Sequence, residues 1–310
     1  MFRLSILGCG SALPTTKHCL SSQVVSLHDK HYMIDCGEGT QMQFRAMKLN
    51  FQRLGHIFIS HLHGDHCFGL PGLISTLGML GRTSDLHIYA HADAVQLFKP
   101  ILDYSCRAIG YSVFFHDFNP SQSELLFENK GLKVTSIPLK HRVPTAGFLF
   151  EEKEGNRHII RAMTDFYKIP VSKMNAIKAG EDFVTPDGVI VPNVRLTLPA
   201  DPAMKYAYCS DTAYYRKIIP IIESVDVLYH EATFANVDLK RAKETFHSSA
   251  AHAAEIAKEA RVKQLILGHF SARYTDETIL LREAQEIFPN TVLANEKMIF
   301  DIDAKKIKNK

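Results

Sequence analysis

The sequence predicts an α/β fold in which sheets and helices form layers. Short apolar runs typical of strands alternate with helical patterns along most of the chain. The composition is that of an ordinary globular protein, with 46% hydrophobic and 22% charged residues. At 310 residues the chain can bury a large core as one α/β unit, and it shows no short tandem repeat.

The expected strands are short apolar stretches bounded by glycine, polar residues or turns. They are residues 2–8, 23–27, 31–35, 55–60, 86–90, 132–137, 205–210, 225–230 and 263–268. The second and third form a hairpin in this interpretation. Helices are expected after the glycine turn of DCGEGT at 35–40, over residues 67–80, over 248–260 and over 276–287. Ser248 or Ser249 is the expected N-cap of the third of these helices.

Residues 151–203 have a different character. They are charged and are interrupted by five prolines, at positions 170, 186, 192, 199 and 202. This pattern predicts an insertion or surface arm that lies outside the core. The C-terminal KKIKNK is expected to be a solvated tail.

Charge, cysteine usage and hydropathy limit the function classes. Lys plus Arg is 36 and Asp plus Glu is 33, so the net charge is 36 − 33 = +3. An anionic substrate would therefore have to be attracted by a local patch. The six cysteines are scattered without a C-x-x-C pair, which indicates reduced thiols in a cytoplasmic protein. The start MFRLSILGCGSALP lacks a signal-peptide pattern, and no run of 18 apolar residues predicts a membrane span.

The strongest chemical signal is the motif HLHGDH at residues 61–66, directly after a predicted strand. Alternate residues of an extended segment project to one side, so His61 and His63 can reach one metal ion. Asp65 and His66 lie where the chain turns into a helix and can reach a second ion. Three imidazoles and a carboxylate form a donor set suited to zinc.

This motif resembles the metallo-β-lactamase superfamily, and further stretches narrow the resemblance to the ribonuclease Z family. These stretches keep their order over nearly the whole chain. They are GCGSALPTTKHCLSS, DCGEGTQMQ, SHLHGDHCFGLPGL, PLKHRVPTAGFLFEE, YCSDTAY, HEATF, HSSAAHAAEIA and LGHFSARY. The resemblance implies a four-layer αβ/βα sandwich formed by one domain over residues 1–310. An arm insertion over about residues 155–195 would protrude from it to contact tRNA.

The resemblance also implies the remaining ligands. His141 would complete the first metal site with His61 and His63. His269 would complete the second site with Asp65 and His66, and Asp211 would bridge both ions. The implied cofactor is two Zn²⁺ per subunit.

The implied activity is that of a zinc-dependent endoribonuclease. It would cut precursor tRNA after the discriminator base and remove the 3′ trailer with a di-zinc-bound hydroxide. Asp65 would also accept a proton from the attacking water. His247 is the expected proton donor to the leaving oxygen, and Glu231 would orient or charge it.

Affinity for RNA should come mostly from phosphate contacts. The tentative contact residues lie beside the predicted ligands and in the arm. They are Lys140, Arg142, Arg273, Lys173 and Lys178. Two positions depart from the family pattern: His18 stands where an arginine is usual, and the arm stretch IPVSKMNAIKAGEDF lacks a Gly-Pro pair. The family further implies a homodimer.

Two alternatives remain open from the sequence. A general metal-dependent phosphodiesterase of the same fold would share all the ligands and act on small molecules. A non-catalytic zinc-containing RNA-binding protein is the other, although no expected ligand is missing from the chain.

Overall fold

The structure is a computed structural model that describes residues 2–302, so the predicted tail KKIKNK lies outside the described residues. The chain divides into two compact units. One runs to Glu151 and resumes at Met204, and the other is Glu152–Ala203. No helix within residues 2–302 has the length and apolarity needed to cross a membrane.

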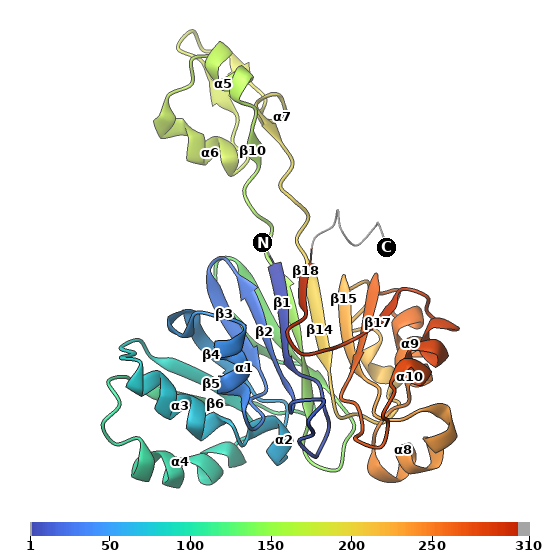
Figure 1. Cartoon of the computed structure of the whole chain (residues 1–310). Coiled ribbons are helices and arrows are strands. Elements are labelled where there is room, and N and C mark those ends of the chain that lie inside the picture. Colours follow the sequence, from blue (N-terminus) through green and yellow to red (C-terminus); the bar gives the residue numbers. More distant parts are fainter. Residues whose placement is uncertain (1, 303–310) are drawn as a thin grey trace. The chain divides into compact units, whose positions relative to one another are not determined.

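The larger unit contains two seven-stranded sheets (Figure 1). The first has the order β18-β1-β2-β3-β4-β5-β6. Its strands are β18 (Ile299–Ile302), β1 (Phe2–Gly8), β2 (Ser22–Leu27), β3 (Lys30–Ile34), β4 (Leu54–Phe58), β5 (Leu86–Ala90) and β6 (Val113–Asp117). The second has the order β17-β16-β15-β14-β9-β8-β7. Its strands are β17 (Thr291–Leu293), β16 (Gln264–Gly268), β15 (Val227–Glu231), β14 (Lys205–Cys209), β9 (Ala146–Glu152), β8 (Leu132–Pro138) and β7 (Leu125–Glu128).

Helices cover the outer face of each sheet (Figure 1). The helices on the first sheet are α1 (Thr40–Ala46), α3 (Leu70–Met79) and α4 (Asp93–Ser105), and α2 (Gly64–Cys67) precedes α3. The helices that follow strands of the second sheet are α8 (Leu239–Thr245), α9 (Ala250–Glu259) and α10 (Thr278–Gln285). Short 3₁₀ turns are η1 (Phe51–Arg53), η3 (Arg216–Ile218) and η4 (Asn236–Asp238). The predicted four-layer αβ/βα sandwich is therefore confirmed.

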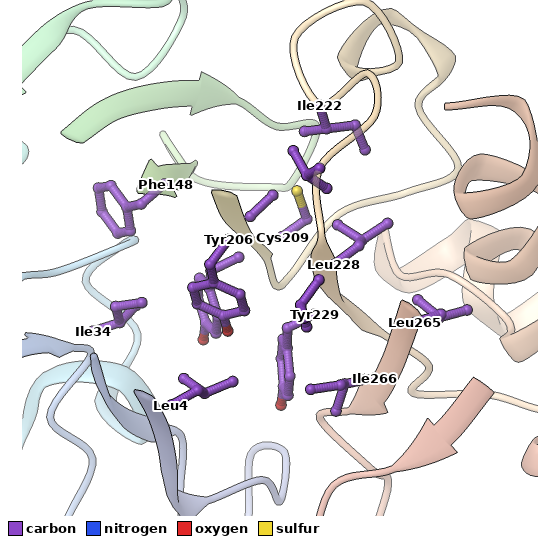
Figure 2. Close-up of a cluster of buried hydrophobic side chains, with 14 of the residues drawn as sticks. Leu4, Ile34, Phe148, Tyr206, Cys209, Ile222, Leu228, Tyr229, Leu265 and Ile266 are labelled. Atoms are coloured by element: carbon purple, nitrogen blue, oxygen red, sulfur yellow. The ribbon is translucent and has the colours of Figure 1, made fainter. Parts of the chain in front are cut away.

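The two sheets pack face to face through a continuous apolar core. Leu4 and Ile34 of the first sheet meet Phe148 and Tyr206 of the second, as Figure 2 shows. Burial of such side chains contributes about 1.5–3 kcal/mol each. Polar bonds also cross the core: the Tyr206 hydroxyl donates to Gln23, so the phenol oxygen is not left unpaired at full burial.

Most predicted elements form with shifts of one or two residues, and the hairpin is β2–β3. The predicted helix 67–80 is two helices, since the chain breaks at Phe68 and Gly69 before the proline of α3. Ser249 is the N-cap of α9, and its hydroxyl accepts from the His252 amide. Strands β6, β7, β9, β17 and β18 were not predicted. Strands β6 and β7 are edge strands that bury few residues, so they lack a clear apolar pattern.

The unit Glu152–Ala203 has a small core of its own, which its proline-rich sequence did not predict. Its helices are α5 (Arg161–Phe166), α6 (Met174–Lys178) and α7 (Asn193–Leu196), with η2 (Val171–Lys173). Its strand pairs are β10 (His158–Ile159) with β13 (Thr197–Leu198), and β11 (Phe183–Val184) with β12 (Ile190–Val191). The Asn193 amide donates to the carbonyls of Ile177 and Glu181 and joins these pieces. Ile177 and Leu196 are fully buried in this unit.

Candidate metal centre

The predicted site residues follow the ends of strands in both sheets. The HLHGDH motif comes after β4, Asp211 after β14 and His269 after β16, while His141 lies between β8 and β9. Asp211 and His269 have positive φ values of 55° and 59°. Left-handed backbone is unfavourable by roughly 1–2 kcal/mol for such residues, so the surrounding packing must enforce these sharp turns.

The HLHGDH motif changes from extended to helical backbone within three residues. His63 is the N-cap of α2 and is extended, with φ −68° and ψ 148°. Asp65 and His66 belong to the first turn of α2. The predicted alternation is seen: His61 Nε2 lies 3.0 Å from His63 Nδ1. Asp65 and His66 therefore project toward a different point from the first two histidines.

The first cluster contains His61, His63, His141 and Asp211, whose donor atoms all lie within 4.8 Å of one another. Asp211 Oδ2 is 3.6 Å from His61 Nε2 and 3.7 Å from His141 Nε2. Three imidazole nitrogens and one carboxylate oxygen thus surround a common point. Such a donor set and size fit a four-coordinate divalent cation.

The second cluster contains Asp65, His66 and His269. The Nε2 atoms of His66 and His269 both lie 3.6 Å from Asp65 Oδ2. Asp211 Oδ1 is 3.1 Å from His66 Nε2 and 3.0 Å from His269 Nε2. Asp211 therefore presents one carboxylate oxygen to each cluster, which is the arrangement that a bridging ligand needs.

Hydrogen bonds to the outer ring nitrogens orient three of these histidines. The Nδ1 of His66 donates to Asp35 Oδ2 at 2.7 Å, and that of His141 donates to the Phe246 carbonyl at 3.0 Å. The Thr233 hydroxyl donates to Glu231 at 2.6 Å, so it accepts from His269 Nδ1 at 2.9 Å. In its neutral form, each of these imidazoles therefore carries its hydrogen on Nδ1, and its Nε2 has a lone pair and no hydrogen.

This tautomer assignment tests whether the residues fit a metal. The Nε2 atoms of His66 and His269 approach to 3.3 Å, although both carry lone pairs in the neutral form. Two acceptors at this distance need a positive charge between or on them. Without a metal the charge must be a proton. Burial is the largest single effect and opposes protonation, but the nearby carboxylates together, Asp211 first and then Asp65, raise the pKa of both histidines. The donor set therefore fits a cation.

Glu231 and His247 form a pair beside the metal ligands. His247 Nδ1 donates to Glu231 Oε1 at 2.8 Å. Burial by itself lowers the pKa of His247, but the charge and hydrogen bond of Glu231, together with the charge of Asp211, raise this pKa overall. The amides of Thr212 and Ser248 also donate to Glu231, at 2.7 and 3.1 Å. The pair therefore favours the protonated form of the imidazole and fixes its position.

These groups line a cavity of about 330 Å³. Its lining residues include His63, Asp65, His141, Asp211, His247 and His269. Of the predicted RNA contacts, only Arg142 is among the lining residues. Lys140 is exposed beside His141, whereas Arg273 is paired with Asp238 and lies over the Phe234 ring. Lys173 and Lys178 belong to the separate unit Glu152–Ala203, and His18 is only 6% exposed.

Three positioning groups were not predicted from the sequence. Asp35 orients His66, Thr233 orients His269, and the Ala12 amide donates to Asp65 Oδ2 at 2.7 Å. Asp35 and Thr233 lie in DCGEGT and HEATF, two of the stretches that resemble the ribonuclease Z family. Their presence in these motifs could have indicated a role at the site. The Ala12 contact is made by a backbone amide, so the identity of the side chain could not have predicted it.

Replacing Asp35 by asparagine is expected to weaken metal binding by about 10–100-fold, the usual effect of removing an outer hydrogen-bond acceptor. The carboxylate accepts bonds from Ser60, His66 and Tyr208, and an amide cannot accept them all. Competition with a fluorescent chelator measures the change. Asp226→Asn, another buried carboxylate, is the control and should lower stability without changing metal affinity. Equal metal affinity for Asp35→Asn and wild type would contradict the role of Asp35.

Comparison with known proteins places this site in a family. The chain is 59% identical over 302 residues to Ribonuclease Z of Bacteroides thetaiotaomicron, covering 97% of this chain and 96% of that protein. It is also 59% identical to Ribonuclease Z of Parabacteroides distasonis, covering 96% and 98%. The chain belongs to the ribonuclease Z family. The predicted family is therefore confirmed, and the clusters described above are the candidate metal centre of a ribonuclease Z family member.

A family model and solved structures provide two further comparisons. A family model described as Anti-Pycsar protein Apyc1 matches residues 2–176, a range that ends within the unit Glu152–Ala203. Among solved structures, human tRNase Z, short form, has a TM-score of 0.70 at 24% identity and covers 97% of this chain and 99% of that one. The metallo-β-lactamase fold protein YhfI of Bacillus subtilis has a TM-score of 0.68 at 19% identity, covering 96% and 98%. These structures support the metallo-β-lactamase fold of the ribonuclease Z family.

Proposed function

We propose that this chain is an endoribonuclease that removes the 3′ trailer from precursor tRNA by cutting after the discriminator base. The observation that carries the proposal is the full-length similarity to Ribonuclease Z proteins together with the two clusters joined by Asp211. Incubation of a 3′-extended precursor tRNA, with the cut mapped to the nucleotide, tests it. Cleavage after the discriminator base that stops with a chelator is expected, and no cleavage by metal-loaded protein would overturn it.

The proposed cofactor is two Zn²⁺ ions, held by His61, His63 and His141 and by Asp65, His66 and His269, with Asp211 shared. A mixed imidazole and carboxylate set suits zinc among the common divalent cations. When bound, paired divalent ions neutralise charge on a phosphodiester and lower the pKa of a water nucleophile. Elemental analysis of active protein identifies the ions, and fewer than two cations per chain would contradict the assignment.

The proposed roles of the chain's own groups follow from their positions. Asp65 accepts the proton of the attacking water, and the Ala12 amide holds its carboxylate in place. His247 gives its proton to the leaving 3′ oxygen, because Glu231 keeps the imidazole protonated. Arg142, at the cavity wall, binds a phosphate near the cut, and Lys140 and Arg273 contact the backbone farther out.

We further propose that the unit Glu152–Ala203 is an arm that grips tRNA, with Lys173 and Lys178 as phosphate contacts. The exposure of two lysines supports this: Lys173 is exposed, and Lys178 is partly exposed, so both can reach a phosphate. The implied homodimer and cytoplasmic location are part of the same proposal. Sedimentation of the purified protein at several concentrations tests the dimer.

Deleting residues 155–200 and joining the ends with a short Gly-Ser linker is expected to weaken precursor-tRNA binding but not hydrolysis of bis-p-nitrophenyl phosphate. Glu151 and Lys205 pair directly in the second sheet, so a short linker can close the gap. The small substrate needs only the metal cavity. Kd for RNA and kcat/KM for the diester are the two readouts, with Lys173→Glu as a milder variant. Equal losses on both substrates would contradict this division.

A small-molecule phosphodiesterase of the same fold is the second candidate. The observation behind it is that a model of a differently described family, Anti-Pycsar protein Apyc1, also matches residues 2–176, a range that contains five of the seven candidate ligands. The mapping experiment separates the two, since such an enzyme would not cut precursor tRNA at one nucleotide. The non-catalytic alternative is contradicted if any metal-dependent cleavage is seen.

A further inference from the structure

A second group of metal-ligand side chains lies outside the cavity described above. Cys9 follows β1, His18 lies in the loop between β1 and β2, and Glu296 lies between β17 and β18. Their donor atoms lie within 4.8 Å of one another. Cys9 is fully buried, His18 is nearly so, and the Glu296 side chain is 15% exposed. Two segments far apart in the sequence, the connection between β1 and β2 and the connection between β17 and β18, thus bring sulfur, nitrogen and oxygen donors together.

The distances between these donors match the edges of a tetrahedron around a metal. Zn–S bonds of about 2.3 Å and Zn–N or Zn–O bonds of about 2.0–2.1 Å place sulfur about 3.5 Å from the other donors, and nitrogen about 3.3 Å from oxygen. Cys9 Sγ is 3.4 Å from His18 Nδ1 and 3.6 Å from Glu296 Oε1. His18 Nδ1 is 3.3 Å from the same Glu296 oxygen and 3.0 Å from the other one, Oε2. One point is therefore within bonding distance of all three atoms.

The other nitrogen of His18 has the partner that metal-bound histidines usually have. His18 Nε2 is 3.2 Å from Glu277 Oε1, and Glu277 also pairs with Lys17. With a metal bound at Nδ1, the Nε2 hydrogen would be donated to Glu277, and the lone pair of Nδ1 would face the common point; without a metal, both ring nitrogens face carboxylates. With Cys9 as thiolate, these side chains carry three negative charges and the one positive charge of Lys17. A divalent cation would offset the difference.

We propose that Cys9, His18 and Glu296 form a third metal site, which takes a zinc-like borderline cation and has a structural role. The site ties the loop after β1 to the segment before β18. That loop also contains Ala12, whose amide holds Asp65. The bound cation therefore stiffens the loop that positions a catalytic group, while its own ligands contact no substrate. The proposal holds whether or not the chain cuts precursor tRNA.

Cobalt substitution provides the test, because among the candidate metal sites within residues 2–302 only the proposed one has a sulfur ligand. The two catalytic clusters supply nitrogen and oxygen donors alone. Full-length protein is stripped with a chelator and titrated with Co²⁺ while its absorption spectrum is recorded. A thiolate-to-cobalt charge-transfer band in the near ultraviolet is expected in the wild type. Its absence at saturating Co²⁺ would overturn the proposal without any variant, and His18 would then be an imidazolium held between Glu277 and Glu296.

Variants assign the band to one cysteine. Cys9→Ser should lose the band and bind one Zn²⁺ fewer per chain by elemental analysis. Cys67→Ser and Cys19→Ser are matched controls, because these thiols lie beside His66 and His18 but outside the proposed ligand set. Both should keep the band. A band that persists in Cys9→Ser, or that disappears in Cys67→Ser, would refute the assignment. If Cys9→Ser does not fold, Glu296→Gln takes its place. This variant should need a higher Co²⁺ concentration to reach half of the full charge-transfer absorbance.

Discussion

Asp65→Ala is expected to lower the single-turnover rate of precursor-tRNA cleavage by at least about 10⁴-fold, while the Kd for the RNA changes little. A single acid–base group typically contributes roughly 10²–10⁴-fold. Asp65 is in addition a candidate ligand, with Oδ2 at 3.6 Å from two ligand nitrogens. RNA affinity rests on phosphate contacts that this change does not touch.

Glu38→Ala is a suitable control for this variant, since Glu38 is an exposed carboxylate at the wall of the same cavity. Its rate should stay within a few-fold of wild type. Rapid-quench cleavage and fluorescence anisotropy provide the rate and the Kd. Cleavage by Asp65→Ala at a rate close to that of Glu38→Ala would remove Asp65 from the proton-transfer step.

His247→Ala is expected to slow precursor-tRNA cleavage by about 10²–10⁴-fold, the range for a general acid. The same change should have a much smaller effect on bis-p-nitrophenyl phosphate, because p-nitrophenolate leaves without being protonated. This contrast separates proton donation from damage to the metal clusters. Damage to the clusters would slow both substrates equally.

His252→Ala controls for loss of a histidine near the site. His252 lies in the first turn of α9, stacks on Tyr214 and does not line the cavity. It should keep nearly full activity on both substrates. Measurements of kcat on the two substrates decide the question, and an unchanged rate on RNA for His247→Ala would show that another group protonates the leaving oxygen.

Local spacing explains what could be predicted about the site. In HLHGDH, the extended backbone places His61 and His63 together, and the following helix turn separates Asp65 and His66 from them. These relations depend only on neighbours in sequence. Strand β16 and helix α9 were predictable for the same reason, since an apolar run ending in glycine and a serine cap are local signals.

The other ligands depend on which strands become neighbours. His141 and His269 are 128 positions apart, and they reach one site because β9, β14, β15 and β16 are consecutive in the second sheet. No local pattern states that order, so only the family resemblance could assign them. The edge strand β6 and the small core around Ile177 were not predicted. Few of their residues are buried, so neither shows a regular alternation of apolar and polar residues.

The sequence by itself determined the layered α/β class, the two groups of candidate ligands in HLHGDH and, through its motifs, the ribonuclease Z family. Only the tertiary structure decided how the ligands are held: by Asp35, Thr233, the Phe246 carbonyl and the Ala12 amide. The same is true of the group formed by Cys9, His18 and Glu296. The physical reason is that hydrogen bonds and metal ligands act over about 3 Å, and chain positions hundreds of residues apart reach that distance only after the sheets have packed.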